Sequence, residues 1–373
     1  MKTWTAEELQ QLRKRMKVWF SKQGRSLPWR ETHDPYAIWV SEIMLQQTQV
    51  ATVIPYFHRF LDAFPTVTAL ADAPEERVLL HWAGLGYYRR AKQLHAASKV
   101  IRDQWEGCFP RDYDAILALP GIGRYTAGAI SSFAYDMRAP IVEANTQRLY
   151  ARLLRLRGQL TERTIQNHLW KFASDILPER SGSGRLNQAV MELGSQVCTP
   201  KAPLCHECPL QSLCPTYAHS EQSEIPSPKP SKVYEDKVEV ALLVRDEGCR
   251  YLLRRCQAGE RWAGLWDFPR FDVTSAQSED ELMTSASRQF SDRFGASVCL
   301  SDEAMQIKHG VTRYRISLRC FHASVEGSNG NPLEPLRGED SPDAVWCSVH
   351  RLTEVPLSST GKRIAKHLAG LQR

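Results

Sequence analysis

Apolar residues recur at helical spacing through roughly the first 217 residues of the chain. The pattern is clearest in "DPYAIWVSEIMLQQTQVATVIPYFHRFLDAF", "PEERVLLHWAGL" and "NTQRLYARLLRL", where apolar positions repeat every three or four residues. Short breaks that contain proline or glycine separate these stretches. Thr5 and Glu8 have the spacing of a capping box at the first helix. The pattern therefore predicts an all-α domain over residues 1–217.

The spacing of apolar residues changes from a helical to a strand-like period beyond residue 236. "KVEVALLV", "RYLLRR", "RYRISLRCFHAS" and "AVWCSV" are typical of strands, and helices are expected near 279–294 and 358–371. Between the two patterns, "AHSEQSEIPSPKPSKVYED" is polar and proline-rich, which favours an extended linker. The sequence thus predicts a multidomain chain: the all-α domain, a linker at 218–236 and an α+β domain at 237–373.

Composition adds limits on location and partners. The chain has 373 residues and a formal net charge of +6, which is compatible with a polyanionic partner without requiring one. No run of about 18 apolar residues occurs, so we expect no membrane span. No secretory leader is recognisable at the start, which favours a cytoplasmic protein. Its ten cysteines are then expected to be thiols or metal ligands rather than disulfides.

Four of these cysteines are crowded into seventeen residues with the spacing C-x6-C-x2-C-x5-C: Cys198, Cys205, Cys208 and Cys214. Crowded thiols predict a metal centre. Zinc prefers paired C-x2-C knuckles and only one is present, while four thiolates from one loop also suit an iron-sulfur cluster. Zinc and unligated thiols remain the alternatives. The spacing resembles the cluster loop of the endonuclease III superfamily of DNA glycosylases, which implies a 4Fe-4S cluster that braces the loop and brings Lys201 to a DNA phosphate.

The stretch "LPGIGRYTAGAI" places Gly121 and Gly123 just before a helix, where backbone amides can face an anion. A lone G-x-G usually marks a simple turn. With the helix "YDAILAL" before it, the stretch resembles the helix-hairpin-helix DNA-binding motif. In proteins with that motif, hairpin carbonyls often bind a monovalent cation; the resemblance assigns this to Leu117, Leu119 and Ile122.

Glu42 is the first candidate catalyst. It shares a helix face with apolar residues in "WVSEIMLQQTQV", where loss of water would raise its pKa and keep it protonated. The alternative is an ordinary surface glutamate. This stretch resembles the MutY adenine-DNA glycosylases closely, and the resemblance implies that Glu42 protonates the adenine ring nitrogen N7.

The MutY resemblance covers residues 5–217 densely and the remainder loosely. It implies an enzyme that removes adenine mispaired with 8-oxoguanine or guanine from double-stranded DNA, and that is expected to act as a monomer. Gln47 and Tyr87 would enter the base stack, and Arg30, Tyr125 and Asn145 would line the base pocket. Bifunctional relatives carry a lysine where this chain has Tyr125, so the chain is expected to leave an abasic site without cutting the strand.

The stretch "PIVEANTQR" departs from the family at a catalytic position. The MutY segment reads "PILDGNV-R", so Glu143 stands where the family has its sugar-side aspartate. Glutamate reaches about 1.5 Å further. Three interpretations stay open: Glu143 is natural and its surroundings accommodate it, it is natural in a protein of slower or shifted activity, or it was introduced to trap substrate. Ala144 and Thr146 also differ from the family segment, which argues against a single engineered substitution.

The second domain is expected to resemble a Nudix fold without its chemistry. In "RQFSDRFGA", Gln289 and Arg293 occupy positions where glutamates would bind magnesium, and only Asp292 keeps a charge. MutY proteins commonly carry F-S-H on a hairpin that contacts the lesion. Here "KHGVTRYRI" offers Thr312 and Arg313 instead, either as lesion contacts or as ordinary outward residues of a hairpin.

Three other functions stay open from the sequence. One is a mismatch glycosylase of the same fold for another base. Another, suggested by Glu143, is a lesion-binding protein that does not cut. A Nudix hydrolase is the least favoured because the metal carboxylates are missing.

Overall fold

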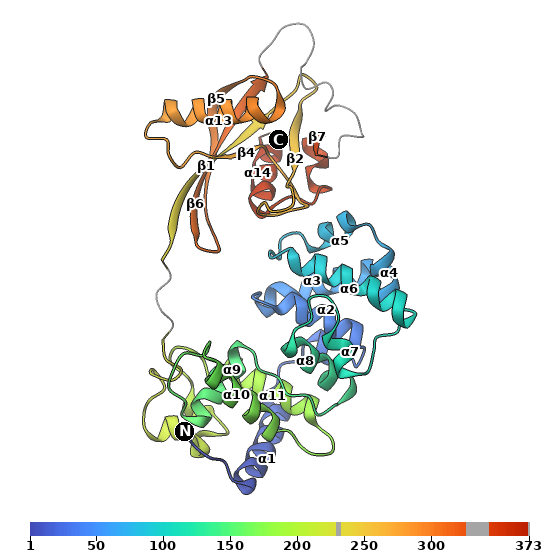
Figure 1. Ribbon diagram of the computed structural model, residues 1–373, viewed down its shortest axis with the longest axis vertical. Coiled ribbons are helices and arrows are strands. Elements are labelled where there is room, and N and C mark those ends of the chain that lie inside the picture. Colours follow the sequence, from blue (N-terminus) through green and yellow to red (C-terminus); the bar gives the residue numbers. More distant parts are fainter. Residues whose placement is uncertain (229–232, 326–342, 372–373) are drawn as a thin grey trace. The chain divides into compact units, whose positions relative to one another are not determined.

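The computed structural model describes residues 1–228, 233–325 and 343–371, which form two compact units (Figure 1). Unit 1 comprises Met1–Ala73 and Arg89–Pro230, and unit 2 comprises Pro74–Tyr88 and Ser231–Arg373. The helices of unit 1 are α1 (Ala6–Gln23), α2 (Pro35–Leu45), α3 (Val50–Ala63), α4 (Val67–Asp72), α6 (Arg89–Trp105), α7 (Tyr113–Leu117), α8 (Arg124–Tyr135), α9 (Ala144–Leu154), α10 (Arg163–Asp175), α11 (Ser183–Gln196) and α12 (Pro215–Ala218).

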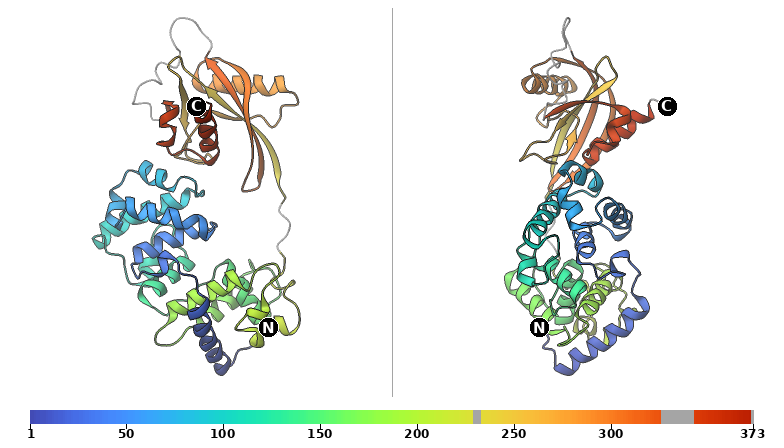
Figure 2. Two further views of the ribbon diagram at one scale, coloured as in Figure 1. Left: turned by 180° about the vertical axis from the view of Figure 1, so that it is seen from behind. Right: turned by 90° about the vertical axis from the view of Figure 1, so that its right-hand side faces the viewer.

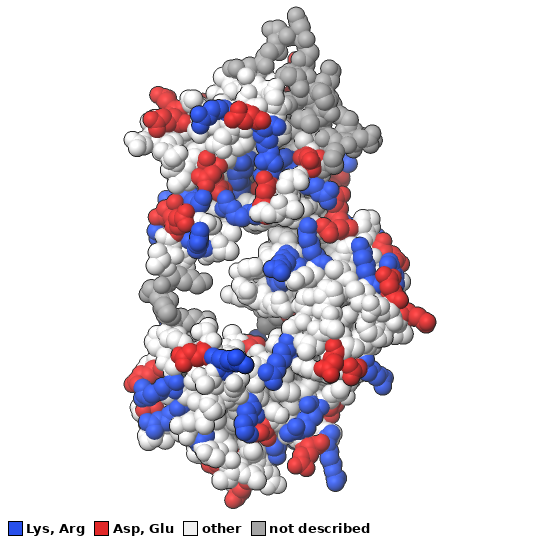
Figure 3. All heavy atoms as spheres, in the orientation of Figure 1, with Lys and Arg blue, Asp and Glu red and all other residues white. Residues whose placement is uncertain are grey.

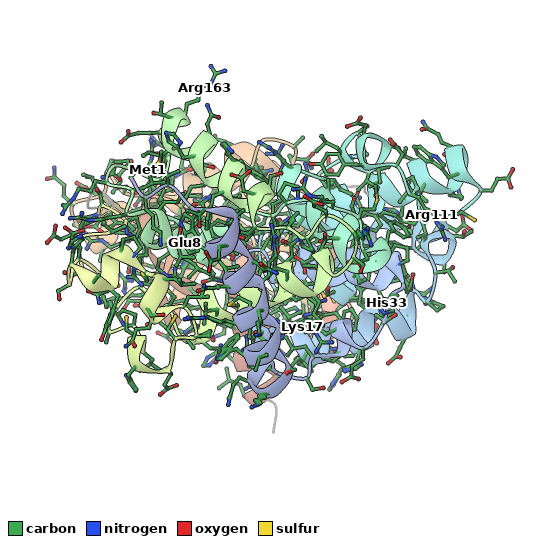
Figure 4. All side chains as sticks on the ribbon, turned by 90° about the horizontal axis from the view of Figure 1, so that it is seen from below. Met1, Glu8, Lys17, His33, Arg111 and Arg163 are labelled. Carbon is green, nitrogen blue, oxygen red and sulfur yellow. The ribbon has the colours of Figure 1, made fainter. Side chains whose placement is uncertain are left out.

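The first helix illustrates how local sequence sets these boundaries. Thr5 accepts the Glu8 amide at 3.2 Å, and the Glu8 carboxylate accepts the Thr5 amide at 3.0 Å, which forms the expected capping box. One face of α1 buries Leu12 and Met16 in the core that α9, α10 and α11 share. Figure 4 shows α1 along one side of unit 1, with Glu8 near its start and Lys17 further along.

Part of the predicted linker packs into unit 1. Ile225 is fully buried in the same core as α9, and its carbonyl accepts a hydrogen bond from the Arg152 guanidinium at 2.9 Å. Arg155 forms an ion pair with Glu221 at 2.7 Å. Of the predicted linker, residues 229–232 lie outside the described residues.

Unit 2 holds two sheets. Its strands are β1 (Glu235–Val244), β2 (Arg250–Arg255), β3 (Trp266–Asp267), β4 (Arg270–Asp272), β5 (Val298–Val311), β6 (Tyr314–Val325) and β7 (Ala344–Ser348). One sheet has the order β4-β1-β6-β5, with β1 parallel to β6, and the other has the order β3-β2-β7. The helices are α5 (Glu75–Trp82), α13 (Glu279–Phe294) and α14 (Ser359–Gly370).

Strand β1 shows why both sheet faces are covered. Val240, Leu242 and Val244 point into a core with α13, whereas Ala241 and Leu243 point into a second core with α14. In Figure 2, α13 and α14 lie on opposite sides of the sheets. A strand buried on both faces reads as a continuous apolar run, as "VALLV" does.

The predicted fold class is confirmed: a helical unit precedes an α+β unit, and the helices expected near 279–294 and 358–371 are α13 and α14. Strands β3, β4 and most of β5 were not predicted. In the described ranges, no helix has both the length and the apolar character that crossing a membrane requires.

Candidate active site and nucleic-acid interface

Glu42 lies on α2, a helix whose residues Tyr36–Met44 are all buried. Asp34 caps the start of α2 by accepting the Tyr36 amide at 3.0 Å, and Pro35 occupies the first turn. Because no side of this helix meets solvent, Glu42 is only 3% exposed. A carboxylate in such surroundings needs a specific partner.

Tyr125, on α8, is that partner. Its hydroxyl donates a hydrogen bond to Glu42 Oε2 at 2.5 Å. Burial raises the pKa of Glu42 to about 7; the hydrogen bond from Tyr125 lowers it, and the negative charge of Glu143 raises it. Glu42 is therefore protonated in a large fraction of molecules near neutral pH, unlike an exposed glutamate.

Glu143 is the N-cap residue of α9. Its Oε2 accepts the Asn145 amide and its Oε1 accepts the Thr146 amide, both at 2.8 Å. Burial raises the pKa of Glu143 above its usual value, although the two amides lower it. The carboxylate that interrupts "PIVEANTQR" is thus built into the start of a helix.

One cavity of about 880 Å³ brings all four predicted catalytic residues together. This volume lies in the range of pockets that enclose a small ligand such as a nucleobase. The predicted residues that line it are Arg30, Glu42, Gln47, Gly123, Tyr125, Glu143 and Asn145.

Glu192, on α11, is a cavity residue that the sequence did not indicate. Its carboxylate binds Arg25 Nε at 2.6 Å and an Arg30 guanidinium nitrogen at 2.9 Å. Burial opposes its charge, yet the hydrogen bonds from Arg25 and Arg30 outweigh burial and lower the pKa of Glu192. Arg30 therefore lines the cavity as one half of an ion pair. The only sequence signal is an acidic residue within the apolar stretch "AVMELG".

Arg148 connects the start of α9 to its surroundings. Its guanidinium donates to Asn145 Oδ1 at 2.9 Å, to the Gly194 carbonyl at 2.6 Å and to the Cys198 carbonyl at 2.7 Å. The side chain of Asn145 is consequently oriented by a buried arginine. The same arginine joins the surroundings of Asn145 to Cys198, the first residue of the cysteine loop.

The hairpin before α8 leaves backbone amides accessible. Gly121 has φ +76° and a Cβ there would lie 2.6 Å from Gln93 Cβ, while a Cβ at Gly123 would meet nothing within 4 Å. Gly123 caps α8 without a side-chain hydrogen bond, which leaves the helix N-terminus available for an anion. Arg124 lies over the Trp170 ring at 3.8 Å. Two glycines and a helix end are the elements of a phosphate site.

The predicted cation ligands lie in the same hairpin. The Leu119 carbonyl already accepts the Ile122 amide at 3.1 Å, which closes the turn. Binding of a monovalent cation by the carbonyls of Leu117, Leu119 and Ile122 remains a prediction.

Three residues predicted to contact DNA share a left-handed backbone: Gln47 has φ 58°, Tyr87 has φ 48° and Thr312 has φ 54°. Residues other than glycine adopt this region rarely, and its use often marks functional turns. Gln47 lines the cavity in unit 1, and Tyr87 and Thr312 belong to unit 2. Tyr87 is 57% exposed whereas Tyr88 is 6% exposed, so only one of the two neighbouring tyrosines is a core residue.

Thr312 and Arg313 form the turn of the β5–β6 hairpin. The Arg313 side chain is 70% exposed, pairs with Glu235 at 3.6 Å and donates to the Tyr314 hydroxyl at 2.9 Å. Both residues are placed for contact with a large ligand. Their geometry equally suits an ordinary outward-facing hairpin, so lesion contact remains a prediction.

The helix α13 holds the residues of the degenerate Nudix stretch. The side-chain amide of Gln289 donates to the Asp272 backbone carbonyl at 3.0 Å, and Arg293 forms an ion pair with Glu260 at 3.4 Å. Neither position supplies a carboxylate for magnesium. Both side chains instead make structural contacts.

The cluster loop, residues 198–214, gathers its four thiols around one small cavity that Arg152 also lines. Arg152 donates to Cys198 Sγ at 3.2 Å, and Gln222 Nε2 donates to Cys205 Sγ at 3.8 Å. Hydrogen bonds to sulfur favour the thiolate, the form that binds metal. The donor set fits an iron-sulfur cluster bound by four thiolates.

A single zinc ion fits the sequence of the loop less well. Zinc prefers paired C-x2-C knuckles, and the loop has only the pair Cys205 and Cys208. When bound, the cluster would brace this loop, which carries the exposed Lys201.

Positive and negative side chains, Lys and Arg with Asp and Glu, are intermixed on the face of each unit that Figure 3 shows. DNA contact is therefore expected to rest on local groups such as Lys201 and the hairpin amides, and only in part on overall charge.

Changing Cys205 to serine is expected to abolish the visible iron-sulfur absorbance. It should also weaken DNA affinity by at least about tenfold, because the loop loses its brace. Absorbance spectra and DNA titration check this, with Cys299→Ser, an exposed cysteine of unit 2, as the matched control that keeps both. A colourless native protein that contains zinc would contradict the assignment.

Comparison with known families divides the chain in the same way. A model of HhH-GPD superfamily base excision DNA repair proteins matches residues 40–175, and one of the iron-sulfur binding domain of endonuclease III matches residues 198–214. A NUDIX domain model matches residues 240–367. The cluster prediction is thereby confirmed.

Curated relatives and solved structures agree with these matches. The adenine DNA glycosylase of Buchnera aphidicola subsp. Schizaphis graminum is 36% identical over 256 residues, which is 68% of this chain and 73% of that protein. That of Mus musculus is 39% identical over 262 residues, 68% of this chain and 50% of that protein.

A thermostable thymine-DNA glycosylase structure has a TM-score of 0.51 at 27% identity, over 57% of this chain and 98% of that one. A trapped endonuclease III–DNA intermediate has a TM-score of 0.50 at 22% identity, over 58% of this chain and 99% of that one, which supports the fold alone. The family matches, together with the Buchnera relative of which this chain covers 73%, show that the chain belongs to the adenine DNA glycosylase family of base excision repair enzymes.

Proposed function

We propose that this chain swings an adenine mispaired with 8-oxoguanine or guanine out of double-stranded DNA and hydrolyses its glycosidic bond, leaving an abasic site. One observation carries the proposal: a buried glutamate with a pKa of about 7 shares a cavity with a second carboxylate. Two carboxyl groups whose environments differ are what acid-assisted cleavage of a glycosidic bond requires.

Glu42 supplies the proton in this proposal. Adenine is a poor leaving group as an anion, and protonation of N7 lets it depart neutral. Protonated Glu42 can donate, and the Tyr125 hydroxyl, which already donates to Glu42 Oε2, stabilises the carboxylate that forms. The hydrogen-bonded pair of Glu42 and Tyr125 is thus suited to both the protonated and the ionised form of Glu42.

Glu143 stabilises the sugar side. As the bond breaks, positive charge develops on the deoxyribose, and a carboxylate nearby lowers the energy of that state. Glu143 lines the same cavity, and two backbone amides hold its oxygens. Tyr125 cannot form the Schiff base that precedes strand cleavage, so the proposed enzyme is monofunctional.

The remaining parts of the chain have supporting roles in the proposal. Residues 1–217 form the glycosylase domain, 218–236 the linker and 237–373 a lesion-recognition domain in which Thr312 and Arg313 face 8-oxoguanine. Gln47 and Tyr87 fill the gap that the adenine leaves. We further propose that the protein acts as a monomer in the cytoplasm, on chromosomal DNA.

A single-turnover assay tests the proposal. Duplexes with adenine opposite 8-oxoguanine, guanine or thymine are incubated with excess protein, and abasic sites are revealed by alkali. Cleavage only after alkali, and only at the first two pairs, is expected. Cleavage without alkali contradicts the monofunctional assignment, and release of a different base favours another mismatch glycosylase.

The rate of base removal is expected to have a bell-shaped dependence on pH. It should rise as Glu143 ionises, above the usual pKa of a glutamate, and fall above about pH 7, where Glu42 loses the proton it must donate. Single-turnover rates across this range check the prediction. A rate that stays flat well above pH 7 would remove Glu42 as the acid.

A lesion-binding protein that does not cut is the second candidate. Its support is the glutamate at position 143 in place of the family's aspartate. Retarded but uncleaved DNA in the same assay would favour it.

A further inference from the structure

The helix α9 begins with a capping box whose two residue types are exchanged. The usual box has Ser or Thr at the N-cap and Glu three residues later. Here Glu143 is the N-cap residue and Thr146 is three residues later, and each side chain bonds the other's backbone. The longer carboxylate therefore folds back onto the amides of its own helix.

The Thr146 hydroxyl contacts both backbone groups of Glu143. Its oxygen accepts the Glu143 amide at 2.8 Å and donates to the Glu143 carbonyl at 3.1 Å. Thr146 is fully buried, so water cannot replace these bonds. A valine at this position would have nearly the same shape without the hydroxyl.

The backbone that follows Glu143 is closely packed against α11. A Cβ on Gly194 would lie 2.8 Å from the Asn145 carbonyl oxygen, so α9 and α11 are already in close contact there. Arg148 ties the same turn to the Gly194 and Cys198 carbonyls. The side chain and its immediate partners must therefore set where the carboxylate lies.

We propose that Thr146 is a positioning residue that compensates for the longer carboxylate of Glu143. The hydroxyl fixes the peptide groups on both sides of Glu143, and the carboxylate is thereby held against the Asn145 and Thr146 amides. This inference rests on the proposed function, in which Glu143 is the sugar-side carboxylate. It assigns to this chain a pairing of residues 143 and 146 that aspartate does not need.

A double-mutant cycle tests the pairing. Thr146→Val and Thr146→Ser are made in the native chain and in the Glu143→Asp chain, and single-turnover base removal is measured. In the native chain, Thr146→Val should lower the rate at least about tenfold, because a misplacement of about 1 Å can cost a positioned group about a hundredfold. Thr146→Ser keeps the hydroxyl and should retain the rate. In the Glu143→Asp chain, Thr146→Val should change little.

The pH dependence separates positioning from stability. Loss of the hydroxyl should move the rising limb of the rate to higher pH in the native chain, because a looser carboxylate loses part of the amide bonding that lowers its pKa. The inference would be overturned if Thr146→Val lowered the rate equally in both chains or did not lower it at all. It would also be overturned if the rising limb of the pH profile did not move.

The failure of this inference can be told from failure of the proposed function. If the native chain releases adenine and Thr146→Val lowers the rate equally in both chains, the proposed function stands and Thr146 does not compensate. If the native chain is inert while the Glu143→Asp chain is active, the proposed function of this chain fails and the inference falls with it. If both chains bind DNA but neither releases adenine, the proposed function itself is wrong and the inference falls with it.

Discussion

Replacing Glu42 by glutamine is expected to lower adenine removal at least about thousandfold, within the range of general acid catalysis. Glutamine has nearly the same shape, and its carbonyl can still accept the Tyr125 hydrogen bond, so the fold should persist. It cannot give up a proton at neutral pH. The measurement is the single-turnover rate on adenine opposite 8-oxoguanine, with DNA affinity measured in parallel and expected to stay within about threefold.

The matched control for this change is Glu7→Gln. Glu7 is exposed in the first turn of α1, so its substitution removes one carboxylate without touching the cavity. Its rate should equal that of the native chain. Unchanged turnover by the Glu42→Gln protein would show that another group, or water, protonates the leaving base.

Much of the fold was predictable because the chain's periodicities are strong. The helices of unit 1 follow from repeated apolar spacing, and β1 from its continuous apolar run. Strand β5 was mostly missed because only Val298 and Ile307 of its fourteen residues are buried, so no alternation marks it. Long pairing with β6 stabilises β5, and single-strand patterns do not carry that information.

The candidate site was predictable to the extent that it lies in short, distinctive stretches. Glu42, Tyr125 and Glu143 come from separate parts of the sequence, and the structure places all three at one cavity. Glu192 and Arg148 were not found. Each acts through a buried partner on another helix, and a lone charged residue in a helical stretch gives no sign of which partner it will meet.

The geometry of Glu143 bears directly on whether the departure from aspartate disables the site. A misplaced glutamate would be expected to point away from the helix or to force the backbone apart. Instead its two oxygens accept two amides at 2.8 Å, and its own amide is bonded by Thr146. Ala144 and Thr146, which also differ from the family pattern, lie within this same turn. The three departures therefore form one local arrangement.

If the carboxylate stabilises the developing charge, the native chain is expected to remove adenine at a high rate. The Glu143→Ala chain should be at least about thousandfold slower, and the Glu143→Asp chain should keep a rate within about tenfold of native. Alanine also removes the helix cap, which should cost about 1 kcal/mol of the free energy of unfolding. Thermal unfolding measured beside the rates separates that loss from the catalytic one, and DNA affinity should change little.

The opposite ordering has an equally definite meaning. A native chain that is almost inert, together with a Glu143→Asp chain that is fast, would show that the amides hold the longer carboxylate in a position from which it cannot reach the sugar. The protein would then bind the mispair and retain it, because neither the hairpin nor the cluster loop includes this side chain. The capping geometry supports the first ordering, in which the native chain is active and only the Glu143→Ala variant loses activity.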